Sequence, residues 1–208
     1  MKAYNFLKFL ESKKGKKLPL LYRFIHEPHT ISGKDLNIDG YLDLNRKPVE
    51  SLPNDLHIEY YLDLFGTPIK KLPRGLKVGA SLTLGDTDSV EIPSDIEIGD
   101  TLSLKRIQHV RLHPGTDNIH SIYADSVARL DLPSGLYLEG TLQLTDTNVG
   151  RLPEKLVIGK NLQIENTDIV TLPDSISIGL DLEIVGRAFR KLPETVEYPG
   201  SIYLQNTS

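Results

Sequence analysis

Aliphatic residues recur along this chain with a period of 20 residues. From position 52 onward, every twentieth residue is aliphatic: Leu52, Leu72, Ile92, Leu112, Leu132, Leu152, Leu172 and Leu192. Proline follows directly in every case but one, where His113 stands instead. Each unit adds two apolar pairs, an L-x-I pair such as Leu76 and Val78 and an L-x-L pair such as Leu82 and Leu84. The chain is therefore built from one repeated structural unit.

The L-x-L spacing places both leucines on one face of a short strand, and the residues between them point outward. Proline after the first aliphatic position predicts a turn outside the strand ladder. Turn residues, often glycine, separate the two pairs in most units: Gly79, Gly99, Gly140, Gly159, Gly179 and Gly200. The pattern predicts a β-rich solenoid over residues 32–208, with about nine 20-residue coils whose equivalent strands form a parallel sheet.

The LP step, the L-x-L strand and the fixed period resemble the short leucine-rich repeats of bacterial and phage proteins, including LPX-type effectors. This resemblance implies a leucine-rich-repeat solenoid and a bacterial or phage source. One departure is that threonine often replaces the asparagine usual after the strand: Thr67, Thr87, Thr147, Thr167 and Thr207. A triangular β-helix is the alternative cross-section. LPX-type effectors often carry a cysteine-dependent ubiquitin ligase domain, and this chain has no cysteine, so that activity is not expected.

A helical cap is predicted over residues 1–30. Ala3, Phe6, Leu7 and Leu10 share one helix face, and a second apolar face follows Pro19. The basic loop between the two helices contains Lys13, Lys14, Lys16 and Lys17. We expect the cap to cover the first coil; contact of the loop with phosphate or with an acidic partner is the alternative. Residues 201–208 still follow the repeat, so the last coil is predicted to fray or to be covered by a partner or a second copy, giving a homodimer.

Composition narrows the function classes. The absence of cysteine excludes disulfides, zinc–thiolate sites and a cysteine nucleophile, and it fits a reducing compartment. No apolar stretch reaches the roughly 18–20 residues that span a bilayer, so we expect a cytoplasmic protein without a membrane segment. Residues 1–30 carry seven basic and two acidic residues, leaving 17 basic and 26 acidic residues in the body. Nucleic-acid binding along the body is therefore not expected.

The outward positions of the L-x-L strand provide the main candidate site. They place aromatic residues beside acids, a combination typical of protein-binding surfaces. The candidate partner-binding residues are Tyr41, Asp43, Tyr61, Asp63, Phe65, Tyr123, Glu183 and Tyr203. Tyrosines that only pack on each other across coils are the alternative. Asp43 and Asp63 also suggest a carboxylate pair for glycoside hydrolysis, but an open strand lacks the pocket that separates two pKa values.

The unit over residues 112–131 departs from the repeat. Proline moves to Pro114, and Thr116 and Asn118 take the two apolar L-x-I positions. His109, His113 and His120 lie in or beside this unit and form a secondary candidate locus. A local bulge, a docking site at a kink and a metal site are the three interpretations. The histidine spacings match no standard metal motif, so no metal is expected.

The sequence as a whole predicts a non-catalytic protein–protein interaction module that acts through the outward L-x-L face. A bacterial or phage binder that inhibits a host or defence protein is one form of this hypothesis. No phosphate-binding loop, dinucleotide fingerprint, zinc-protease motif or esterase motif occurs, so no cofactor is expected. The alternatives are a carbohydrate-active or otherwise catalytic β-helix, and nucleic-acid binding through the basic cap.

Overall fold

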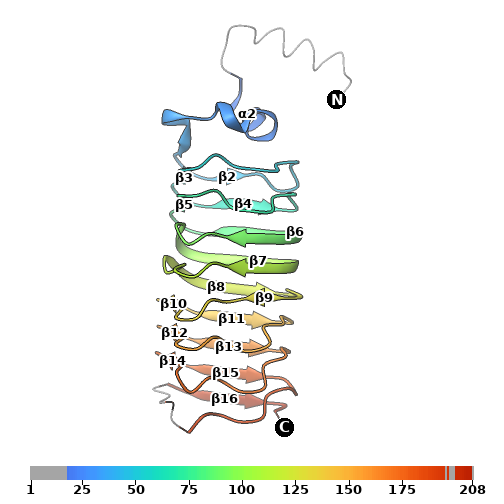
Figure 1. Cartoon of the computed structure of the whole chain (residues 1–208), viewed down its shortest axis with the longest axis vertical. Helices are drawn as coiled ribbons and strands as arrows, with labels where there is room; N and C mark the ends of the chain where they lie inside the picture. The colour runs from blue at the N-terminus through green and yellow to red at the C-terminus, as the bar shows by residue number, and fades with distance from the viewer. Residues whose placement is uncertain (1–17, 195, 197–199, 208) are drawn as a thin grey trace.

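The computed structural model describes residues 18–194, 196 and 200–207. These residues form a long stack of coils that begins with one short helix and ends with strand β16 (Figure 1). Within the described residues, nine strands follow one another along one side of the stack, so the chain makes eight full turns between the first and the last. The predicted parallel β-solenoid is thereby confirmed.

The L-x-L pairs build the main sheet. Its strands are β2 (Leu42–Asp43), β4 (Leu62–Phe65), β6 (Leu82–Ile92), β7 (Glu97–Leu112), β8 (Ile119–Asp125), β11 (Leu142–Thr145), β13 (Leu162–Glu165), β15 (Leu182–Val185) and β16 (Ile202–Gln205). Neighbouring strands are parallel and pair residues 20 positions apart, as in Leu142 with Leu162. The leucines point inward, and Leu44, Leu64 and Leu84 are fully buried. The other residues of these strands form the outward surface that we call the L-x-L face.

The L-x-I pairs build a second side of each coil. Their two-residue strands are β1 (Asn37–Ile38), β3 (His57–Ile58), β5 (Lys77–Val78), β10 (Tyr137–Leu138), β12 (Val157–Ile158) and β14 (Ser177–Ile178). β1, β3 and β5 continue into the start of β7, whereas β10, β12 and β14 form a separate sheet. The start of β7 pairs with Ile119 at the start of β8, so the L-x-I ladder is interrupted between β8 and β10.

The middle coils also have a third paired side. The end of β6 pairs with the end of β7, and Val110 of β7 pairs with Leu130 of β9 (Leu130–Asp131). Beyond these strands, isolated bridges at Lys71–Glu91 and Thr171–Lys191 pair the third side within the described residues. The middle coils therefore have the three-sided form of the triangular alternative, and the third side is less regular toward both ends.

A left-handed corner follows the L-x-L segment of every coil, and β6 and β7 continue through it. The residues at this position all have positive φ: Arg46, Gly66, Asp86, Arg106, Ser126, Asp146, Asn166, Gly186 and Asn206. Non-glycine residues rarely adopt this conformation, and asparagine and aspartate tolerate it best. A repeated local constraint thus turns the chain from the L-x-L face to the third side.

Glycine after the L-x-I pair lies in a bend in most units, as predicted, and it also has a second role. Gly79, Gly99, Gly159 and Gly179 do not have positive φ. A Cβ on Gly179 would instead lie 2.1 Å from the carbonyl oxygen of Gly159. These glycines are needed because successive coils approach each other too closely for a side chain.

The N-terminal end of the stack is closed by α2 (Leu20–His26), η1 (Pro28–Thr30) and η2 (Gly33–Leu36). Phe24 of α2 is buried in the core that runs through the coils. Arg23 is also buried, and its Nη1 lies 2.6 Å from an Asp35 carboxylate oxygen while its Nε donates to the Thr30 hydroxyl at 2.9 Å. The helix predicted over Ala3–Leu10 and the lysine loop lie outside the described residues.

At the other end of the stack, all four residues of β16 are exposed, including Ile202 and Leu204. The expected pairing of two copies through this coil stays a prediction. No helix among the described residues is long and apolar enough to cross a membrane.

Candidate functional site

The N-terminal part of the L-x-L face brings five of the predicted binding residues together. Tyr41 and Tyr61 precede paired strands β2 and β4, and their rings stack with centroids 5.0 Å apart and planes 10° from parallel. Tyr41 is 60% exposed and Tyr61 is 45% exposed. The rings pack on each other across coils, as one interpretation predicted, but more than two-fifths of each residue remains in contact with solvent.

Asp43 and Asp63 lie side by side at the centres of the same two strands. Asp43 Oδ1 accepts a hydrogen bond from the Asn45 backbone N–H at 2.9 Å, and Asp63 Oδ1 accepts one from the Phe65 N–H at 2.8 Å. Asp63 Oδ2 also accepts from the Asn45 side-chain amide at 3.1 Å. Both carboxylates therefore help to shape the strand ends, and one oxygen of Asp43 keeps capacity for an outside donor.

Phe65 is covered by a cation from two coils further along the chain. The guanidinium carbon of Arg106 lies 4.9 Å from the Phe65 ring centroid. Arg106 also donates to both carboxylate oxygens of Asp86, at 2.7 and 3.2 Å. The hydrogen bond from Arg106 holds the pKa of Asp86 below its usual value, and the same bond raises the pKa of Arg106. The face thus contains a complete cation site built from an aromatic ring and a carboxylate.

The other three predicted binding residues lie farther along the same face. Tyr123 of β8 is 42% exposed, between Ser103 and Gln143 in the paired strands. Glu183 accepts a hydrogen bond from the Gln163 amide at 3.1 Å, and Tyr203 lies next to it on β16. Glu183 and Tyr203 line a shallow hollow of about 300 Å³. The structure therefore places all eight residues on one face, but in three separate groups.

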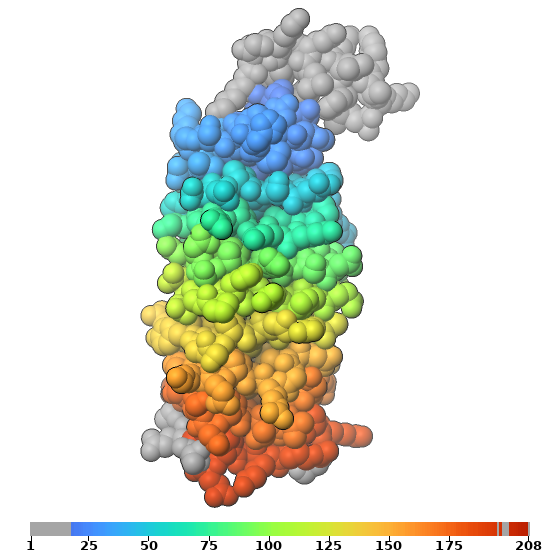
Figure 2. Space-filling model, in the orientation of Figure 1, coloured from blue at the N-terminus to red at the C-terminus, as the bar shows by residue number. Residues whose placement is uncertain are grey.

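Negative charge dominates this face. Along the outward positions and the left-handed corner it carries eight acids, namely Asp43, Asp63, Asp86, Asp125, Asp146, Glu165, Asp181 and Glu183. Only Arg46, Lys105 and Arg106 oppose them. The coils form successive layers of a rod-like body without a deep cleft on the side in view (Figure 2). An extended surface of this kind suits contact with a large partner rather than enclosure of a small one.

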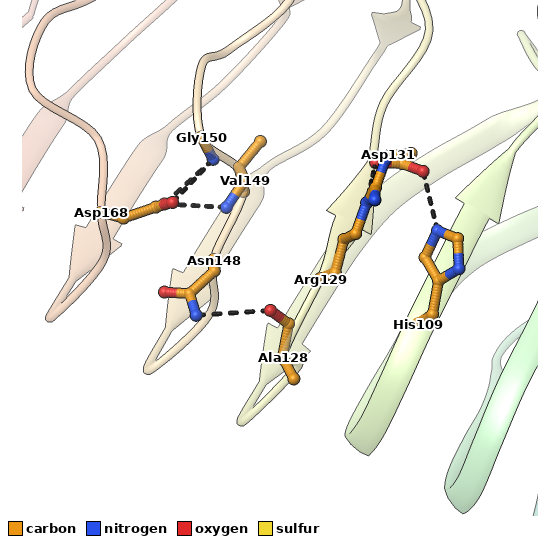
Figure 3. Close-up of polar contacts among 8 residues, drawn as sticks. All are labelled: His109, Ala128, Arg129, Asp131, Asn148, Val149, Gly150 and Asp168. Atoms are coloured by element: carbon orange, nitrogen blue, oxygen red, sulfur yellow. Dashed lines mark hydrogen bonds and ion pairs between the residues drawn. The ribbon is translucent and has the colours of Figure 1, made fainter.

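The three histidines of the secondary locus do not converge on one point. His109 Nε2 lies 2.7 Å from an Asp131 carboxylate oxygen, on the third side (Figure 3). His113 Nε2 lies 3.7 Å from Glu91, and His120 Nδ1 lies 3.3 Å from Glu139 beside the L-x-I strands. Each histidine therefore lies near a different carboxylate. Among the described residues, no group of three or more histidine, aspartate or glutamate side chains is placed to hold a metal ion.

Asp131 also accepts a hydrogen bond from the Arg129 Nε at 2.9 Å (Figure 3). Burial raises the pKa of the Asp131 carboxyl, but the hydrogen bonds from Arg129 and His109 outweigh that effect, and the pKa lies below its usual value. Two coils further along, Asp168 accepts from the backbone N–H groups of Val149 and Gly150 at 2.8–3.0 Å (Figure 3). The contacts of Asp131 with His109 and of Asp168 with Val149 and Gly150 join neighbouring coils.

The irregular fifth coil is a bulge, as one interpretation predicted. Ile98 pairs with Ile119, 21 residues later, and the register returns to 20 at Thr101 and Ser121. Thr116 is buried at the first L-x-I position, but Ile119, and not Asn118, occupies the second. The expectation that Asn118 faces the core was therefore wrong, because one inserted residue moves it to the surface.

A hollow of about 400 Å³ lies at this interruption of the ladder. Its lining includes Glu97, Asp117, His120, Tyr137 and Glu139. Glu97 already forms an ion pair with Lys77 at 2.8 Å, and Glu139 is the carboxylate beside His120. The hollow is thus a consequence of the bulge, with most of its charges engaged by neighbouring side chains.

Comparison with protein-family models, with curated proteins and with solved structures found no match. The functional argument for this chain therefore depends on its own geometry. Sequence reasoning missed Arg106 and Asp86 because they lie after the L-x-L segments, at the left-handed corner. The recurrence of glycine, asparagine and aspartate at that position was the available signal.

Proposed function

We propose that this chain is a protein-interaction module that binds a partner with a basic surface through its L-x-L face. One observation carries the proposal: an exposed, stacked pair of tyrosines lies on a face whose acids outnumber its basic residues by eight to three. Exposed tyrosines bury a large area with little loss of conformational freedom, and charge surplus attracts a partner of opposite sign.

The regular fold supports this use of the face. From β2 to β15 the inward residues of each L-x-L segment are buried, which holds the strands in place, so little backbone ordering is needed when a partner binds. The strands are parallel and in register over successive coils, which gives a flat platform longer than a single binding pocket. Affinity then comes from a few anchors such as Tyr41 and Tyr61, and the acids favour association with basic partners.

Affinity capture with structure-matched variants tests the proposal. The Tyr41→Ala/Tyr61→Ala double variant removes the stacked pair, while Tyr137→Ala removes an equally exposed tyrosine from the L-x-I side. We expect wild-type chain and the Tyr137→Ala variant to retain a partner in quantitative mass spectrometry. The double variant should lose affinity by about tenfold or more, as for anchor residues. Binding should also weaken as salt concentration rises.

Equal recovery of the same partners by the double variant and by wild type would show that the stacked pair is not part of a binding surface. Asp63→Ala is unsuitable for this test, because it also removes hydrogen bonds to Phe65 and Asn45. Thermal unfolding of each variant shows that a loss of binding is not a loss of fold.

A further inference from the structure

The stack of aromatic rings on the L-x-L face stops after Tyr61. Tyr41 covers one side of the Tyr61 ring from the preceding coil. On the following coil the equivalent position is Ser81, whose carbonyl accepts the hydrogen bond from the Leu62 N–H at 3.0 Å. A serine side chain is too short to continue the stack. The side of the Tyr61 ring that faces this coil is therefore open, consistent with its 45% exposure.

A carboxylate lies on the far side of this opening. The Ser81 hydroxyl donates to Asp100 Oδ2 at 3.3 Å, and the Thr101 hydroxyl donates to Oδ1 at 3.3 Å. Asp100 itself is exposed. Tyr61 and Asp100 lie two coils apart, and neighbouring coils are about 4.8 Å apart. This separation leaves room for one planar group between them, next to Ser81. We call the place bounded by Tyr61, Ser81 and Asp100 the Tyr61 slot.

Another aromatic ring on the same face, that of Phe65, is covered by an arginine of the chain itself. There the paired positions on successive coils are Phe65, Gly85 and Lys105, and Arg106 follows Lys105 directly. The Arg106 guanidinium extends back over the Phe65 ring and pairs with Asp86.

At the Tyr61 slot the equivalent positions are Tyr61, Ser81 and Thr101, and the residue before Thr101 is the acid Asp100. The carboxylate therefore lies one coil beyond the small residue, whereas Asp86 follows Gly85 on the same coil. The Tyr61 slot thus has the ring and the carboxylate of the Phe65 position without its cation.

We propose that the Tyr61 slot receives the guanidinium of an arginine side chain from the partner protein. This inference rests on the proposed function and names the group that the L-x-L face recognises. Guanidinium is planar, stacks on aromatic rings and donates two parallel hydrogen bonds to a carboxylate. Lysine lacks the plane, and an anionic ligand is repelled by Asp100 and by neighbouring Asp63. An uncharged sugar ring could stack on Tyr61 but gains nothing from the negative charge.

A small probe tests the slot in the full-length chain. ¹⁵N-labelled protein is titrated with N-acetyl-arginine amide and observed by NMR, with N-acetyl-citrulline amide as the uncharged probe of matched shape. We expect saturable shifts of the backbone amides of Tyr61, Ser81 and Thr101 with the arginine probe at millimolar concentrations. The citrulline probe should bind several-fold more weakly because it lacks the charge. Equal binding of both probes, or stronger binding of a neutral disaccharide such as cellobiose, would overturn the proposal.

Two substitutions separate the slot from general attraction to an acidic face. Ser81→Tyr extends the aromatic stack into the slot and should abolish the shifts. Asp100→Asn keeps the shape and should raise the dissociation constant by about three- to fivefold, as expected for an exposed charge pair. Asp181→Asn removes the same charge from the same face at a distant coil, and it should leave the constant unchanged. If Asp100→Asn and Asp181→Asn changed the dissociation constant equally, the probe would be held by non-specific attraction to the acidic face. The proposed slot would then be refuted.

The captured partner distinguishes this inference from the function on which it rests. Loss of the partner by the Tyr41→Ala/Tyr61→Ala variant with full retention by Ser81→Tyr and Asp100→Asn would keep the interaction face and refute the arginine slot. Loss by all three supports both. Retention by all three refutes both as features of that partner's binding site. Circular dichroism and thermal unfolding of each variant identify any substitution that disturbs the coil.

Discussion

At the scale of single residues, most polar side chains are engaged by their neighbours within the stack. Asp43 and Asp63 bind backbone N–H groups at the ends of their strands, and Asp168 does the same for Val149 and Gly150. Asp131 pairs with Arg129 of its own coil and with His109 of the preceding coil. The residue type alone did not distinguish these structural acids from Asp100, which lies beside an open aromatic ring. The kind of donor decided the difference, because Asp100 accepts hydrogen bonds from the hydroxyls of Ser81 and Thr101 and not from a strand-end backbone N–H.

Asp131 gives a prediction on pH dependence. Its pKa in the folded chain is below that of an unfolded aspartate, which is about 3.9. The ion pair therefore stabilises the fold above that value, and this contribution is lost as pH falls through the folded pKa. Because the Asp131 side chain is 35% exposed, the contribution should stay below about 1 kcal/mol. Urea unfolding of wild type and Asp131→Asn should therefore differ at pH 6, and the difference should shrink as pH falls through the folded pKa. Asp88→Asn, which changes an exposed aspartate, serves as the control. If the difference in free energy of unfolding between Asp131→Asn and wild type stayed the same at every pH, the prediction would be contradicted.

At the scale of the strands and turns, stacking sets requirements that recur once per coil. The L-x-L leucines alternate with outward residues, as their spacing predicted, and a left-handed corner then turns the chain toward the third side. Glycine after the L-x-I pair lets one backbone approach the carbonyl of the coil before it. Sequence reasoning assigned the glycines to turns but missed this close approach, since a period of 20 residues does not show how closely two coils approach.

Gly179→Ala tests this close approach. The added Cβ would lie 2.1 Å from the Gly159 carbonyl oxygen, so the coils must move apart. We expect a loss of about 2 kcal/mol in the free energy of unfolding, within the range for overpacked sites. Gly135→Asn is the matched control, because it has positive φ but nothing within 4 Å of a Cβ, and asparagine tolerates that conformation. Urea titration measures both, and equal stability of Gly179→Ala and wild type would rule out the steric role.

At the scale of the whole molecule, the L-x-L ladder and the L-x-I ladder of the solenoid differ in continuity. The L-x-L ladder runs unbroken from β2 to β16, whereas the L-x-I ladder is interrupted beside the fifth coil. Regular coils bond the amide after the first L-x-I leucine to the preceding coil, as Val157 N–H does to Leu136 at 2.9 Å. Within the described residues, Tyr137 has no such bond to the fifth coil. The interruption divides one side of the stack into two segments.

Amide hydrogen exchange should locate this division. The Tyr137 amide is expected to exchange at least about tenfold faster than the amides of Val157 and Ser177, because exchange follows the local opening of hydrogen bonds. All three occupy the same position in successive coils, so they are matched in surroundings. NMR-detected exchange under native conditions gives the three rates, and equal protection would mean that the ladder is continuous through the bulge.

The sequence by itself determined the period, the inward leucines, the parallel solenoid and the face on which Tyr41, Tyr61 and Phe65 lie. These follow from spacing, because a residue's place in a repeat sets its side of the coil. Only the tertiary structure decided the third paired side, the shift from Asn118 to Ile119, the separate positions of the three histidines, and the partners of each acid. It also brought Tyr61, Ser81 and Asp100 together. Residues 20 apart in sequence become neighbours about 4.8 Å apart only after stacking, and the contacts made at that distance depend on the conformation of each side chain.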